Sequence, residues 1–194
     1  SEQKKGRMAK LEGWNLDGAV LEMANLPIAR LQFASLKGAI LEGGNFRQAK
    51  LNRVNLVEAR LAGADFESAD LSGANLSSTE CEGANFAEAN LEGVNFESAN
   101  LDETSFKGAN LRGANFKNAI LSFADMRGAD LDGANFDGTD FDGTNFKETI
   151  LEKDNLKETN FKEADMSEFD IDHLKSREDA KNEDDNVFNL IVNK

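Results

Sequence analysis

The sequence predicts an all-β solenoid, because its apolar residues repeat with a period of five over most of the chain. Every fifth position from Leu11 to Ile171 holds Leu, Phe, Met, Ile or, once, Cys81. A small residue usually stands two places before this apolar residue, and 14 of the 16 glycines fall two places after it. We call the large apolar residue position i, so the small residue is i−2 and the glycine is i+2. These regularities indicate one short structural unit that is used many times.

A period of five fits neither a helix nor a flat strand. On a helix, each repeat would advance about 140° past a full turn and spread the apolar side chains around the cylinder. On a flat strand, residues five apart point to opposite faces. Each repeat must therefore be a short extended piece followed by a bend, with i−2 and i inside and i−1, i+1 and i+2 outside. Stacked coils of this kind bury a narrow apolar column.

The bend is predicted at i+1 to i+2, because glycine tolerates backbone conformations that are costly for other residues. Asn, Asp or Ser occupies i−1 at every second repeat, as in Asn15, Asn25 and Asn155. Side chains of this kind bond neighbouring backbone groups or stack as ladders from coil to coil. We interpret them as structural residues rather than as ligands.

The repeats resemble the pentapeptide-repeat family, whose motif A(D/N)LXX stands here as Ala69–Gly73 and Ala109–Gly113. The resemblance implies a right-handed quadrilateral β-helix with four repeats per coil, and so about eight coils. Leucine at 11, 31, 51, 71, 91, 111, 131 and 151 agrees with a coil of twenty residues. The expected organisation is an N-terminal extension (1–8), the β-helix (9–171) and a C-terminal cap or tail (172–194).

Residues 9–30 depart from the consensus and are expected to form the terminal coil. Trp14 occupies an i−2 site and is expected to help close the column, and Pro27 is the single proline. Exposed apolar residues gathered near one end of a protein form either a packing site for the N-terminal segment or a surface for a partner. The candidate apolar patch consists of Val20, Met23, Ile28, Phe33 and Ile40.

The net charge of −14 is distributed unevenly. With four repeats per coil, one face holds the outward residues of the repeats centred on 21, 41, 61, 81, 101, 121, 141 and 161. Nine acidic residues against two basic ones give this acidic face a net charge of −7, whereas no other face exceeds −3. Such acids also keep a regular rod soluble and oppose edge-to-edge association. The candidate acidic residues are Glu22, Glu42, Glu80, Glu82, Asp102, Glu103, Asp140 and Asp142.

After Ile171 the fivefold period is lost. A short helix is expected over about 172–182, followed by an apolar run that either covers the last coil or pairs two rods. The run consists of Val187, Phe188, Leu190, Ile191 and Val192. The chain is therefore expected to be a monomer or a homodimer that forms through its C-terminal segment.

The sequence contains no motif that predicts catalysis. Its one histidine, His173, lies far along the chain from Cys81, and there is no Cys/His cluster or glycine-rich phosphate loop. The carboxylates are spread over a convex surface, which assembles no substrate pocket. We therefore expect no enzyme activity and no cofactor. No apolar run approaches the ~20 residues that cross a membrane, and a cytoplasmic location is expected.

Two classes of function remain. One is a rigid scaffold that binds a protein partner through its faces or ends. The other follows from the resemblance: relatives that bind type II topoisomerases such as DNA gyrase are similar to DNA in shape and charge, as inhibitors or in quinolone protection. Duplex DNA of ~38 Å carries roughly 22 charges, far more than the acidic face. We therefore favour the scaffold, and we expect no direct binding to nucleic acid.

Overall fold

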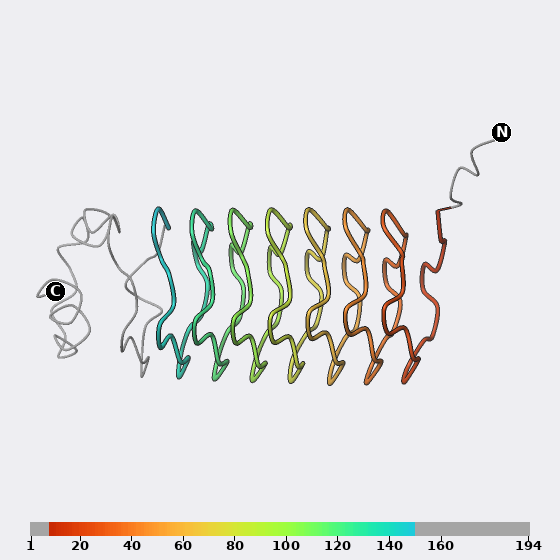
Figure 1. Cartoon of the computed structure of the whole chain (residues 1–194), viewed down its shortest axis with the longest axis horizontal. Coiled ribbons are helices and arrows are strands. Elements are labelled where there is room, and N and C mark those ends of the chain that lie inside the picture. Colours follow the sequence, from red (N-terminus) through yellow and green to blue (C-terminus); the bar gives the residue numbers. More distant parts are fainter. Residues whose placement is uncertain (1–7, 150–194) are drawn as a thin grey trace, which may run out of the picture.

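The computed structural model describes residues 8–149, which form a rod of stacked coils (Figure 1). Parallel β-bridges join each residue at i−1 to the residue twenty places later, as in Lys10 with Arg30 and Asn75 with Asn95. Each coil therefore takes twenty residues, and its four repeats supply four sides and four turns. The predicted coil length is confirmed over the described residues.

Backbone hydrogen bonds hold neighbouring coils together. The N–H of Leu91 donates to the carbonyl of Asn110 in the next coil at 2.7 Å, and the N–H of Asn110 donates back to Ala89 at 3.0 Å. Within the repeat, the N–H of Val94 donates to Leu91 at 3.1 Å and closes the turn. Because this set recurs along the rod, the backbone polar groups are satisfied without a conventional sheet.

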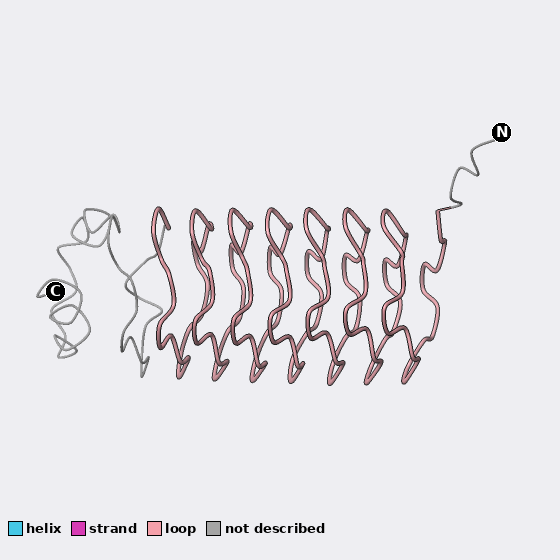
Figure 2. Cartoon of the chain, in the orientation of Figure 1, coloured by secondary structure: helices cyan, strands magenta, loops and turns pink. Residues whose placement is uncertain are grey.

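Within residues 8–149 there is no helix and no extended strand (Figure 2). Each side of a coil contributes an isolated bridge at i−1, because the turn occupies i+1 and i+2. The all-β prediction therefore holds as a solenoid of bridges rather than of strands. The right-handedness of the coil stays a prediction.

The turn places every described i+2 residue in the left-handed region. From Gly13 to Glu148, φ at this position lies between 55° and 70°, at fourteen glycines and at fourteen other residues. This confirms the predicted bend. The conformation is strained for residues with a Cβ, which explains why glycine gathers there and why bulky residues such as Phe123 (φ 57°) are unusual.

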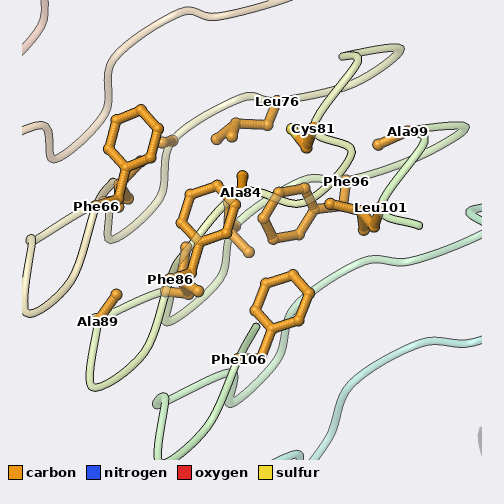
Figure 3. Packing of buried hydrophobic residues seen from close by; sticks show 14 of the residues in the cluster. Phe66, Leu76, Cys81, Ala84, Phe86, Ala89, Phe96, Ala99, Leu101 and Phe106 are labelled. Atoms are coloured by element: carbon orange, nitrogen blue, oxygen red, sulfur yellow. The ribbon is translucent and has the colours of Figure 1, made fainter. Parts of the chain in front are cut away.

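The side chains at i and i−2 fill the interior, as the pattern predicts. From Ala29 onward they are almost completely buried, and phenylalanine rings stack along the column (Figure 3). The ring of Phe86 is nearly parallel to those of Phe66 and Phe106, with centroids 5.1 and 5.5 Å away, and forms a T-shaped pair with Phe96, whose centroid is 5.8 Å away. Ring stacking of this kind adds to the stabilisation from buried apolar area.

The few buried polar side chains have partners in the column. Thr104 donates from Oγ1 to the carbonyl of Cys81 at 3.0 Å, and Thr139 does the same to Phe116 at 2.8 Å. The thiol of Cys81 is buried and unpaired with another cysteine, and it donates to Thr79 Oγ1 at 3.2 Å. Burial raises the pKa of Cys81 to about 12, so this cysteine is a core residue and not a nucleophile.

The asparagines at i−1 form ladders along the rod. Asn95 donates from Nδ2 to Asn75 Oδ1 at 3.3 Å, and its own Oδ1 accepts from Asn115 Nδ2 at 2.9 Å and from the N–H of Glu97 at 3.1 Å. The same Asx contact to i+1 recurs on all four sides. Their predicted structural role is confirmed.

The first coil contains the residues that depart from the repeat consensus. Pro27 stands at i+1 of a turn, a position whose N–H makes the Asx contact to i−1 in many other repeats, so proline here removes none of the backbone bonds that recur between coils. Trp14 is exposed rather than packed into the column, contrary to expectation. The predicted repeats from 150 to 171, the predicted helix over about 172–182 and the apolar run Val187–Val192 lie outside the described residues.

Candidate protein-binding face

The twenty-residue register builds the acidic face from three parallel columns. Bridges connect the i−1 column from one coil to the next, beginning with Val20 and Ile40 and ending with Ile120 and Asp140. The i+1 and i+2 residues of the same repeats form the other two columns, in the turns. On the other three faces the i−1 column is largely Asn, Asp, Ser or a basic residue. The acidic face is the one on which apolar residues, Val20, Ile40 and Ile120, stand in the i−1 column.

The charge difference between the faces persists over the described residues. The acidic face has eight carboxylates and one cation, Arg60, so its net charge is −7. The other three faces, over the same coils, have net charges of −2, −1 and 0. Acidic and basic residues are mixed on those three faces, and they are segregated on this one.

On two of the other faces, arginines pair with several of the neighbouring carboxylates. Arg47 binds Asp65 and Glu67, and Arg112 binds Asp130 and Asp132. The hydrogen bonds that Arg47 donates to Glu67 and Asp65 raise its pKa, and the bond to Asp130, with the charge of Asp132, raises the pKa of Arg112. These exposed pairs stabilise the fold little, but they cancel the local charge.

The acidic face has one such pair, between Arg60 and Glu42 at 2.6 Å. Within the part of the chain that the structure describes, Glu80, Glu82, Asp102 and Glu103 form no salt bridge. Asp102 Oδ1 is buried against the rod and has no hydrogen-bond partner among the described atoms. The middle of this face is therefore a set of carboxylates without cations of the chain's own.

The candidate apolar patch is spread over several sides of the first coils. Val20, Ile40 and Met23 belong to the acidic face, and Val20 and Met23 are 70% and 73% exposed. Ile28 and Phe33 stand at the next two turns of the coil, and both are exposed. The structure thus brings three of the five residues together and separates them from the other two.

Sequence reasoning missed two exposed apolar residues in the C-terminal half of the acidic face. Ile120 (46% exposed) stands in the i−1 column and Phe123 (61% exposed) in the i+2 column of the same repeat. Both positions are outward in the fivefold pattern, so the signal was present in the sequence.

Within residues 8–149, no three His, Cys, Asp or Glu side chains are grouped so as to hold a metal ion. None of the described segments is a helix long and apolar enough to span a membrane. What the acidic face offers chemically is a flat array of exposed carboxylates with apolar side chains between them.

The stacked coils and inward columns define the class of the protein as a repeat solenoid. The model for pentapeptide repeats matches it in eight copies, over residues 9–43, 45–78, 79–118, 109–147 and 119–157. The chain belongs to the pentapeptide-repeat family. It is thus a repeat scaffold, and no curated protein sequence matches it significantly.

Solved structures of the family are similar to the chain. A trypsin-treated variant of QnrB1, a plasmid-mediated fluoroquinolone resistance protein, is 22% identical over 78% of this chain and 89% of its own, with a TM-score of 0.58. This likeness supports the fold. HetL of Nostoc sp. strain PCC 7120, which is involved in the regulation of heterocyst differentiation, is 28% identical over 81% of this chain and 84% of its own, with a TM-score of 0.42.

Proposed function

We propose that the chain is a non-catalytic rod of the right-handed quadrilateral β-helix type that binds a protein partner through its acidic face. The observation that supports this proposal is the segregation of charge. Arginines on the other faces pair with Asp65, Glu67, Asp125, Asp130 and Asp132, whereas Glu80, Glu82, Asp102 and Glu103 at the centre of the acidic face form no salt bridge among the described residues. Complementary charge steers association and selects partners. The partner surface is therefore basic.

A DNA-mimicking function toward a type II topoisomerase is the second candidate, and the acidic face is the observation in its favour. The fold likeness to QnrB1, a fluoroquinolone resistance protein, makes the comparison natural. Charge density argues against it. From Glu22 to Asp142 the face spans about six coil steps, ~29 Å, over which DNA carries about 17 charges. The net charge of the face is only −7, and apolar side chains interrupt it.

Affinity capture from the native host tests the scaffold proposal. The full chain, immobilised, is compared with a variant in which Glu80, Glu82, Asp102, Glu103, Asp140 and Asp142 are replaced by Lys. We expect a captured protein that the variant loses and that rising salt releases, because exposed charge pairs are screened. Capture that is equal with both forms would contradict the role of this face.

A gyrase supercoiling assay distinguishes DNA mimicry from the scaffold proposal. A DNA mimic inhibits or protects the enzyme at micromolar concentration, and the six-lysine variant does not. We expect no effect from either form. Inhibition by the wild-type chain alone would favour mimicry over the scaffold.

A further inference from the structure

Ile120 and Phe123 lie on the acidic face in positions where they do not contribute to the core. Ile120 stands between Asn100 and Asp140 in the i−1 column, which on another face of the rod is filled by an asparagine ladder. It makes no side-chain ladder contact and is 46% exposed. An asparagine here would have Asn100 Oδ1 as a neighbour and would be expected to bond it.

Phe123 is costly for the rod in two ways. Its φ of 57° is a strained conformation for a bulky residue, and its ring is 61% exposed. The ring leans over Gly143 of the next coil, where an added Cβ would lie 2.5 Å from Phe123 Cδ1. The ring is therefore held against the outside of the rod and not in the core. Features that cost stability without packing are typical of functional sites.

Acidic residues flank this pair in both neighbouring coils. The N–H of Glu103 donates to the carbonyl of Ser122 at 2.9 Å, and the N–H of Phe123 donates to the carbonyl of Asp142 at 2.8 Å. These bonds fix Asp102 and Glu103 one coil before the pair, and Asp142 one coil after it. Coils stack at ~4.8 Å, so the carboxylates lie within reach of one partner side chain that covers Phe123.

A second phenylalanine at an i+2 position shows what such a ring can bind. Phe33 (φ 61°) is covered by Arg53 of the next coil, whose guanidinium carbon lies 6.0 Å from the ring centroid. The residue that corresponds to Arg53 in the coil after Phe123 is Gly143. Phe33 thus receives a guanidinium from the rod itself, whereas no guanidinium of residues 8–149 is recorded over Phe123.

We propose that Ile120 and Phe123, with Asp102, Glu103 and Asp142 around them, bind an arginine-rich segment of a protein partner. An arginine stacks its guanidinium on the Phe123 ring and bonds the flanking carboxylates, and Ile120 contacts an apolar residue or the methylene stem of the segment. This inference rests on the proposed function and names its site and the chemistry of its partner. Lysine fits less well, because its ammonium lacks the planar face that stacks on a ring.

Fluorescence anisotropy with a labelled peptide of about twelve residues, in which arginines alternate with leucine and serine, tests the proposal on the full chain. Its twin has lysine in place of each arginine. The key variant is Ile120→Asn with Phe123→Gly, which restores residues common at these positions in this chain and is expected to melt at the same temperature or higher. Phe123→Ser is a second variant, since Ser68, Ser78 and Ser98 already adopt this backbone conformation.

The matched control is Val57→Asn with Ser78→Gly, which likewise replaces an outward apolar residue and a non-glycine residue at i+2, but on a face other than the acidic one. We expect the wild type and the control to bind the arginine peptide alike, the key variant to bind it about tenfold more weakly, and the lysine twin to bind the wild type weakly. Equal binding by the key variant, equal binding of the two peptides, or no binding by the wild type would each overturn this site. None of those results would remove a partner that affinity capture recovers, so the two proposals fail separately.

Discussion

Phe86 shows how a single residue supports the coil. Its ring is stacked between two others and is fully buried in an apolar column. Phe86→Asp places an unpaired charge in this column, and we expect the described coils to unfold around it, because an isolated buried carboxylate costs several kcal/mol. Thermal melting followed by circular dichroism measures the loss.

Two further variants, Leu91→Asp and Glu92→Ala, compare an inward position with an outward one. Leu91 is buried and Glu92 is exposed in the next position of the same repeat. We expect Leu91→Asp to unfold the rod and Glu92→Ala to melt within a few degrees of the wild type. Equal melting temperatures for all three variants would show that the inward and outward assignment is wrong.

Asp125 gives the rod a pH-dependent contact. Burial alone raises the pKa of its carboxyl, but hydrogen bonds from the side chain and N–H of Arg127 outweigh this, so the net pKa is lowered. A carboxyl whose folded pKa is depressed stabilises the fold above its unfolded pKa of about 3.9 and loses that contribution as the pH falls through the folded value.

We therefore expect Arg127→Ala to lower the free energy of unfolding at pH 7, and the difference from the wild type to vanish as the pH falls through the lowered pKa of Asp125 in the folded state. Urea titrations at about pH 7, 5 and 3 measure it. Lys117→Ala is the control, since Lys117 forms no ion pair among the described residues. A difference that is the same at all three pH values would assign the effect of Arg127 to packing and not to the carboxyl.

The repeated element is the pentapeptide, and nearly all of its geometry follows from the sequence. Position i+2 was predicted to need an unusual backbone because glycine gathers there, and the structure extends this to residues as large as Phe33 and Phe123. The inward columns were predicted from the same pattern. The absence of extended strands among the described residues was not predicted. Periodicity gives the direction of the side chains, but not how many backbone hydrogen bonds form along each side of a coil.

The asparagine ladder is the element that holds neighbouring coils in register on their outer surface. The side chain of Asn95 makes three hydrogen bonds of the ladder, with the side chains of Asn75 and Asn115 and with the N–H of Glu97. We expect Asn95→Ala to cost about 1–3 kcal/mol, since it leaves partly buried groups on two coils without partners. Chemical denaturation measures this, and Asn118→Gly, in a turn outside the ladder, serves as the control. A cost that is no larger at Asn95 than at Asn118 would contradict the ladder's role.

The candidate site was predicted only in part. The sequence assigned the carboxylates of the acidic face correctly to one face, because a twenty-residue coil fixes which residues align. It did not show that Glu42 is paired with Arg60 while Glu80 and Glu82 are not, because pairing depends on how side chains reach between coils. Phe123 was not predicted as a site residue. Its exposed ring lies over Gly143, which has no side chain, and this arrangement becomes visible only when the register between coils and the backbone angle of Phe123 are both known.

For the rod as a whole, we infer that one of four similar faces is used for recognition. The molecule offers a direct way to test this, because Cys81 is buried and its thiol resists labelling. A single new cysteine can therefore carry a bulky polyethylene glycol on a chosen face. Ser122→Cys lies on the acidic face, and Ser77→Cys, Ala87→Cys and Glu92→Cys lie on the other three.

The decisive measurement is the amount of partner protein that each of the four labelled rods captures, relative to its own unlabelled form. We predict that labelling at Ser122→Cys abolishes capture and that labelling at the other three positions leaves it unchanged. Retained capture at Ser122→Cys, or loss at any one of the other three, would contradict the assignment of recognition to the acidic face.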